Sequence, residues 1–173
     1  MLAQRGGQKP SAPIQKRNQR KPDMGLAEIR TQIKTLLETV PGIGKVHDYE
    51  RLTRDWNTFL SFFRDSNGRI NGWTIGRLFA REKFRGASPV NIRTHQIVIR
   101  GYYGLKDSLE TDKTFQSLIE SICAVLRSNS DLNGSCFRSD PPQVTKIYPR
   151  TFGGVLVHYT EIVLSVEEYV AYS

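Results

Sequence analysis

The sequence is poor in cysteine. Among its 173 residues only Cys123 and Cys136 occur, and they form no CxxC pair. This spacing excludes the common zinc sites and a disulfide-stapled scaffold. Cys123 falls on the apolar face of a predicted helix, which favours a buried free thiol and a reducing compartment, although one disulfide stays open as an alternative. A chain of this length buries about two-thirds of its unfolded surface and needs no such staple.

Long hydrophobic runs are also missing. No apolar run in the sequence approaches the roughly 18 residues that a membrane-spanning helix requires. The N-terminus is basic but lacks the apolar core of a signal peptide. We therefore expect the protein to be made and kept in a cytoplasm.

Catalytic sequence patterns are absent as well. The chain has no G-x-S-x-G elbow, no phosphate-binding P-loop and no G-x-G-x-x-G after a predicted strand. His47, His95 and His158 fall on three different predicted strands, without an acidic partner at metal-ligand spacing. Asp48 and Glu50 lie near His47, but they fit the wet side of a half-exposed strand. We predict no enzyme, no metal site, no catalytic residue and no cofactor.

Acidic residues are missing from the first 22 positions. The formal net charge is +8, and this segment contributes six of those charges, while the remaining 19 basic and 17 acidic residues nearly cancel. The segment is rich in Gln, Lys, Arg, Pro and Gly, so we predict that residues 1–22 form a flexible basic arm. Its basic residues are Arg5, Lys9, Lys16, Arg17, Arg20 and Lys21.

Three interpretations of the arm stay open. Its Lys and Arg side chains suit contacts with nucleic-acid phosphates. The arm also suits docking on an acidic neighbouring protein, or it is a solvated tail with no specific partner. We treat the six basic residues as candidate contacts to a neighbouring subunit or to DNA. The nearly neutral remainder argues against a nucleic-acid surface over the whole body.

The rest of the chain alternates between helical and strand patterns. A one-sided apolar stripe predicts a helix over 23–40, with Asp23 as its cap. A second long helix is predicted over 111–128, capped by Thr111 or Asp112. Strands are predicted over 46–52, 70–84, 92–103, 143–148 and 155–166.

The order of these elements predicts the fold class. The last two strands form a hairpin through a turn at 149–154, and 155–166 is the central strand. Gly101 marks a bulge or a close backbone approach in its strand. We predict an α+β fold over 23–173: a largely antiparallel sheet of about four to five strands, with two main helices packed on one face.

Residues 54–64 are unusually aromatic, and their spacing predicts a short helix. Such side chains are either core or an exposed patch made for a partner subunit. We take four of them as candidate subunit-interface residues: Trp56, Phe59, Phe62 and Phe63.

Six segments form a pattern that extends from about Gly25 to Glu168. In chain order they are GLAEIRTQIKTLLETVPGIGKVHDYERL, WNTFLSFFRD, INGWTIGRLF, THQIVIRGYYGLKDS, TFQSLIESICAVLRS and GGVLVHYTEIVLSVEE. In the order of their elements and the general character of their sequences, they resemble the tail-terminator and minor tail proteins of long-tailed bacteriophages. No catalytic motif carries the resemblance, and the basic arm has no counterpart in it.

The resemblance implies a structural virion protein. Such proteins form a homo-oligomeric ring, usually hexameric, that caps the polymerised tail tube, ends its growth and presents a surface for head joining. The implied partners are further copies of the chain, the major tail tube protein and head–tail connector proteins, with no membrane. Non-specific DNA contact in the channel is compatible with this assignment.

The implied location is the head-proximal end of the virion tail, after assembly in the host cytoplasm. Two alternatives stay open at this point. One is a head–tail connector or neck protein of similar α+β build. The other is a nucleic-acid-binding module that acts through the basic arm.

Overall fold

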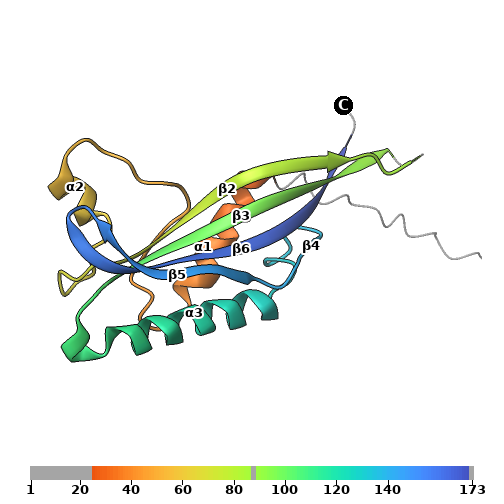
Figure 1. Ribbon diagram of the computed structural model, residues 1–173. Coiled ribbons are helices and arrows are strands. Elements are labelled where there is room, and N and C mark those ends of the chain that lie inside the picture. The colour runs from red at the N-terminus through yellow and green to blue at the C-terminus, as the bar shows by residue number, and fades with distance from the viewer. Residues whose placement is uncertain (1–24, 87–88, 172–173) are drawn as a thin grey trace, which may run out of the picture.

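A computed structural model describes residues 25–86 and 89–171, which form a sheet with two long helices on one face (Figure 1). The fold is α+β, as the sequence pattern predicts. Its elements are α1 (Leu26–Glu38), β1 (Lys45–His47), α2 (Trp56–Ser61), β2 (Asn71–Lys83), β3 (Val90–Gly104), the 3-10 helix η1 (Asp107–Leu109), α3 (Thr111–Ser128), β4 (Arg138–Ser139), β5 (Gln143–Phe152) and β6 (Val155–Ala171).

The sheet is mostly antiparallel. Its order is β1-β2-β3-β6-β4, and β5 also pairs with β6; only β1 and β2 run parallel. The predicted final strand is central, because β6 lies between β3 on one side and β4 and β5 on the other. The sheet has six strands rather than four to five, since β4 is only two residues long and gives no alternating pattern.

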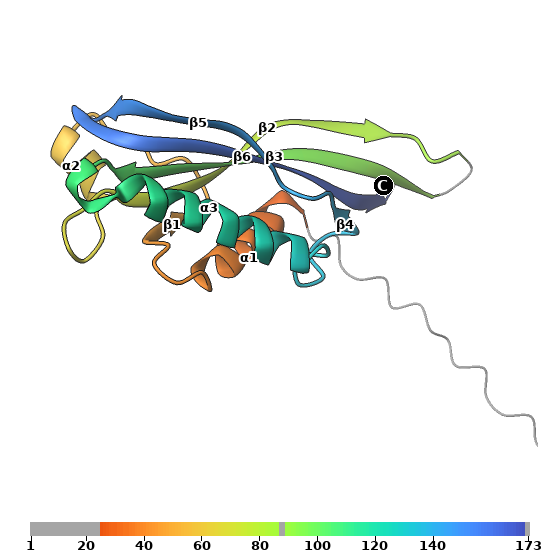
Figure 2. The same cartoon turned by 60° about the horizontal axis from the view of Figure 1, so that its bottom comes forward.

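Helices α1 and α3 cover one face of the sheet and build the main core (Figure 2). Their apolar stripes meet large side chains of the inner strands, among them Trp73, which is fully buried. Burial of each such side chain stabilises the fold by about 1.5–3 kcal/mol, which fixes both helices on this face. The fully buried side chains of the two helices include Ile29, Ile33, Leu37, Phe115, Ile122 and Leu126.

A second, smaller core lies on the opposite face, which we call the open face. Tyr102 packs against this core, whereas its neighbour Tyr103 belongs to the main core. Successive side chains of β3 point to opposite faces, so the two cores lie on either side of the sheet. Helix α2 covers the end of the open face at which this second core lies. The second core consists of Leu60, Phe63, Ile70, Phe152 and Val157.

The predicted strand over 46–52 is wrong beyond His47. Strand β1 pairs only with Gly72–Thr74 of β2, and the chain then leaves the sheet. Residues 48–55 form a loop that crosses the open face, where the Glu50 carboxylate approaches Gly76. The polar side chains at alternate positions of this segment therefore belong to a loop that is held over the sheet, not to a strand within it.

The predicted turn over 149–154 is also wrong. Strand β5 continues through Pro149 to Phe152, and only Gly153 and Gly154 form the turn, with φ of 57° and 78°. Positive φ at both positions suits a two-residue hairpin turn and requires glycine. Proline is tolerated in β5 because an edge strand need not donate every backbone N–H to a neighbour.

The helix starts differ from their predicted caps. Helix α1 begins after Gly25, and Asp23 lies outside the described residues. Helix α3 has Glu110 as its cap. Thr111 does not cap it, because its buried hydroxyl accepts from the Lys106 backbone N–H at 2.9 Å instead. Helix α2 is shorter than the predicted 54–64.

A Cβ on Gly101 would clash with the ring of Trp73, so the close approach at this position is made by a side chain rather than by the backbone. The prediction that Cys123 is a buried free thiol is confirmed.

Candidate functional site

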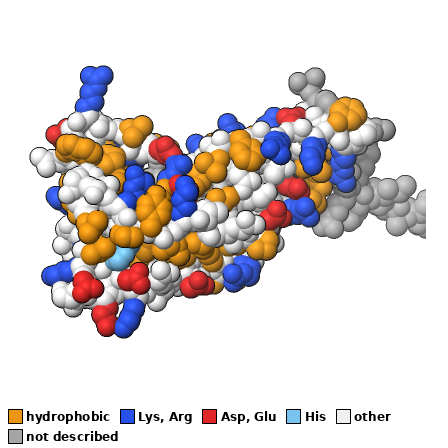
Figure 3. Space-filling view, in the orientation of Figure 1, with side chains coloured by type: hydrophobic (Ala, Val, Ile, Leu, Met, Phe, Trp, Pro, Cys, Tyr) orange, Lys and Arg blue, Asp and Glu red, His pale blue; other side chains and the backbone are white. Residues whose placement is uncertain are grey.

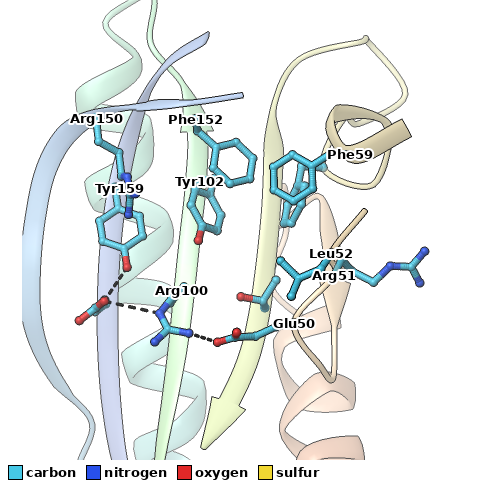
Figure 4. Close-up of a pocket in the computed structure, with 12 residues that line it drawn as sticks. Glu50, Arg51, Leu52, Phe59, Arg100, Tyr102, Arg150, Phe152 and Tyr159 are labelled. Atoms are coloured by element: carbon cyan, nitrogen blue, oxygen red, sulfur yellow. Dashed lines mark hydrogen bonds and ion pairs between the residues drawn. The ribbon is translucent and has the colours of Figure 1, made fainter. Parts of the chain in front are cut away.

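The open face is hollowed between β5 and the loop over residues 48–55 (Figure 4). The hollow has a volume of about 340 Å³. Charged side chains of both signs gather in this hollow beside α2 (Figure 3). The residues that line the hollow include Glu50, Leu52, Phe59, Arg100, Phe152 and Tyr159.

Arg100 of β3 is the centre of an ion network in the hollow. Its guanidinium donates to the Glu50 carboxylate of the loop, and its Nε lies 3.5 Å from Oε1 of Glu161 on β6. Glu161 also accepts from Lys146 Nζ at 2.8 Å and from the Tyr159 hydroxyl at 2.5 Å. The network therefore ties the loop to β3, β6 and β5.

The network perturbs the titration of its members. Burial alone would raise the pKa of Glu161, but hydrogen bonds from Lys146 and Tyr159 outweigh it and lower that pKa. Burial, together with the hydrogen bond to Glu161, raises the pKa of the Tyr159 hydroxyl. Burial would lower the pKa of Arg100, but the nearby Glu50 carboxylate helps raise it. These groups hold their charge states firmly around neutral pH.

An aromatic wall closes one side of the hollow. Asp55 begins α2 by accepting a hydrogen bond from the Thr58 backbone N–H at 2.7 Å. The helix then places Phe59 against Phe152 of β5, with ring centroids 4.9 Å apart. Tyr102 of β3 stacks on the same Phe152 ring at 4.0 Å. Each such pair adds about 0.5–1.5 kcal/mol beyond simple burial, so the wall is rigid.

Arg150 is a cation of the hollow for which the described residues provide no carboxylate partner. Its guanidinium lies 4.7 Å from the ring centroid of Tyr159. Both acidic side chains of the hollow, Glu50 and Glu161, are committed to Arg100. The hollow can therefore accept an anionic group next to an aromatic surface.

The structure separates the four aromatic residues predicted at an interface. Phe63 lies in the second core with 1% of its surface exposed. Phe59 and Phe62 are half-buried against that core, and the Arg51 guanidinium covers the Phe62 ring at 3.9 Å. Only Trp56, which is 62% exposed, presents most of its side chain to solvent.

A further apolar surface lies along β5, and we call it the β5 patch. Its side chains point to the helix-covered side of the sheet but reach solvent. It consists of Val144, Ile147 and Leu156, which are 38%, 44% and 50% exposed.

The opposite edge of the sheet carries the β2 patch, Leu78 and Phe79, which are 50% and 46% exposed. Strand β1 covers β2 only at Gly72–Thr74. Beyond that point no strand within residues 25–86 and 89–171 pairs with the outer edge of β2. Both edges of the sheet therefore present uncovered apolar side chains.

The backbones of these two edges are poorly suited to strand addition. Each has a register shift, at Arg77–Phe79 in β2 and at Val144–Lys146 in β5. Strand β5 also carries Pro149 and Lys146, which are common devices against edge-to-edge pairing. The patches therefore favour contact through side chains over the extension of the sheet.

The three histidines are not brought together. In the described part of the chain, no group of three His, Cys, Asp or Glu side chains could hold a metal ion. Each ring is held by a different partner: His47 by the Phe62 carbonyl at 2.8 Å, His95 by Glu168 at 2.9 Å and His158 by Thr111 at 3.0 Å.

Sequence reasoning missed the charged members of the hollow. A signal existed, because Arg100 and Glu161 interrupt apolar, β-prone runs and fall opposite each other in the β3–β6 register. The pairing of those strands was needed to connect the two signals. The six basic arm residues lie outside the described part of the chain.

No protein-family model matches this chain, and no curated protein matches its sequence. Within the described ranges, no helix is both long and apolar enough to cross a membrane.

Proposed function

We propose that this chain is a structural subunit that forms a ring on the end of a phage tail tube, stops its polymerisation and offers a surface for head joining. The observation that carries the proposal is the pair of apolar patches on opposite edges of one sheet. Grouped exposed apolar side chains are typical of interaction surfaces.

The placement of the patches supports a head-to-tail assembly. The β5 patch and the β2 patch have different residues and lie at opposite edges of the sheet. A contact between two different patches is heterologous, and repeating it generates a ring when the rotation closes. The resemblance to tail terminators, which covers about Gly25 to Glu168, is our reason for proposing a closed ring rather than an open filament.

The chemistry of the hollow supports a structural role rather than catalysis. A general acid or base works best with a pKa near the operating pH. Here the pKa of Glu161 is lowered and that of Tyr159 is raised, so both move away from neutrality. The charges instead connect the loop over residues 48–55 to the sheet.

Purified tail tubes test this function. The full chain should bind one end of each tube and prevent further addition of tube protein, as seen by electron microscopy and by tube length. Ile147→Glu should abolish capping, because it places a charge in the β5 patch. Ser117→Glu, on the exposed side of α3, is the matched control. A chain that remains monomeric at high concentration and leaves tube growth unchanged would contradict the proposal.

The same experiment addresses the neck-protein alternative. A connector or neck subunit would share the fold and a ring-forming tendency, but it would bind connector proteins instead of the tube end. Binding to purified connector with no effect on tube growth would assign the chain to that class.

The basic arm favours a second candidate function, the binding of nucleic acid. Its six basic residues come without a single acid. Binding through phosphates should weaken steeply with salt and should be lost on deletion of residues 1–22. DNA binding that survives the deletion would exclude the arm as the binding element.

A further inference from the structure

The hollow leaves apolar surface uncovered. Leu52 points from the loop towards Tyr102 (Figure 4), yet it is 82% exposed. Phe59 is half-buried on the neighbouring wall. A concave site of about 340 Å³ with an apolar wall and a few polar groups is of a size that binds a ligand or a partner side chain.

The charge balance of the hollow defines what it can take. Glu50 and Glu161 are engaged by Arg100, and Glu161 additionally by Lys146. Arg150 keeps its guanidinium over an aromatic ring, with no acidic partner among the described residues. An occupant with one apolar side chain next to a carboxylate would match both features.

The turn before α3 has those features. In η1, Leu109 is 49% exposed, and Asp107 and Glu110 on either side of it are exposed carboxylates. Glu110 pairs with Lys113, whereas no described residue forms an ion pair with Asp107. The turn Asp107–Glu110 therefore presents an apolar side chain beside an unpaired acid.

The turn is held rigidly in its projecting shape. Glu110 has a φ of 49°, and its backbone N–H donates to the Asp107 carbonyl at 2.8 Å. The Thr111 hydroxyl fixes the preceding backbone at Lys106 and is itself held by His158. A non-glycine residue at positive φ is a strained feature that functional segments often contain. A preorganised turn loses little conformational freedom on docking.

We propose that the hollow is the socket for the Asp107–Glu110 turn of a neighbouring copy of the chain. Leu109 enters beside Leu52 and Phe59, and Asp107 pairs with Arg150. The inference rests on the ring assembly proposed above and names a contact that joins its subunits.

The fold requires the contact to be intermolecular. The turn leads into α3 on the helix-covered side of the sheet (Figure 1), while the residues that line the hollow lie on the open face. A chain cannot place its own turn in its own hollow without dismantling the sheet between them. The contact joins two different surfaces, so it is heterologous and consistent with a ring. Strand β5 carries Arg150 on the open face and two residues of the β5 patch on the other face, so both contacts use this strand.

Charge reversal in the full chain tests the contact. Native mass spectrometry first establishes the oligomer of the unmodified chain. Asp107→Lys and Arg150→Glu should each weaken association at least tenfold, and the double variant should recover most of it, because the pair is restored with opposite polarity. Glu38→Lys, on the exposed end of α1, makes the same change of charge away from both surfaces and should leave association unchanged.

The outcomes separate this inference from the proposed function. Rings that persist in both single variants, or a double variant without recovery, overturn the contact and leave the ring intact. Loss with Arg150→Glu alone shows that the hollow takes a different acidic partner, which also overturns the assignment of the turn. An unmodified chain that never associates overturns the ring and the contact together. Circular dichroism checks that every variant is folded.

Discussion

Gly101 of β3 lies directly opposite Trp73 of β2 in the sheet. Its missing side chain leaves room for the Trp73 ring, which a Cβ would approach to 2.3 Å. Because Trp73 is fully buried in a packed core, it cannot move aside without displacing its neighbours.

We therefore expect Gly101→Ala to lower the free energy of unfolding by about 1–3 kcal/mol through overpacking. Gly76→Ala is the matched control on the neighbouring strand, since its Cβ would meet mainly the flexible end of Glu50 at 3.1 Å. Urea unfolding measures both. Equal losses in the two variants would show that the Trp73 contact is not the cause.

Glu161 links the ion network to the pH dependence of stability. Its pKa in the folded protein lies below the ordinary value of 4.5, because the hydrogen bonds from Lys146 and Tyr159 outweigh its burial. Folding thus favours the ionised carboxylate. The stabilisation is present above the unfolded pKa and is lost as the pH falls through the lower, folded pKa.

Glu161→Gln should accordingly flatten the decline of the urea midpoint below about pH 4.5. Glu120→Gln, on the exposed side of α3, serves as the control for a general change of charge. If the urea midpoint of Glu161→Gln declines as steeply as that of the unmodified chain, this carboxylate is not a cause of the pH dependence.

Helix α2 shows how one short element serves two surfaces. Phe63, just after its end, is 1% exposed in the second core, whereas Trp56 at its start is 62% exposed. The sequence interpretation left core and interface open for this segment. The structure places one buried and one exposed aromatic residue on the same short stretch.

We expect Phe63→Ala to cost about 3–5 kcal/mol of folding stability, because it leaves a cavity in the second core. Trp56→Ala should cost much less, and any effect it has should appear in association instead. Chemical unfolding and sedimentation measure the two properties separately. A large stability loss in Trp56→Ala would contradict this division.

At the same scale, sequence patterns located most elements but placed several boundaries wrongly, two of them by a wide margin. The long alternating runs behind β2 and β3 and the apolar stripes of α1 and α3 are strong signals, and those elements lie where predicted. The turn at 149–154 was wrong because Pro149 and the Gly153–Gly154 pair look like one signal, whereas only the glycines form the turn. The strand over 46–52 was wrong because a tethered loop can carry the same alternation.

The hollow could not be predicted from the sequence. Its lining residues come from a loop, from α2 and from four strands. Only the pairing of β3, β5 and β6 brings Arg100, Lys146 and Glu161 together. Which side chains stay exposed also depends on where the helices end on the sheet. The β5 patch, for example, exists because α3 leaves that part of β5 uncovered.

For the whole molecule, the two edges of the sheet decide the kind of assembly. Register shifts, Lys146 and Pro149 hinder direct strand pairing, while the β5 and β2 patches keep apolar side chains in solvent. The hollow and the Asp107–Glu110 turn add a second pair of unlike surfaces. In the ring that we propose, each pair joins different parts of two copies, so every contact leaves one unfilled surface on each side until the ring closes.

Native mass spectrometry of the full chain over a range of concentrations distinguishes a ring-forming subunit from a monomer. We expect one closed oligomer, a hexamer if the resemblance to tail terminators holds, with no growth to higher species. A monomer at every concentration would contradict it. A dimer that goes no further would contradict it equally, because a two-fold contact joins like surfaces and leaves no ring to close.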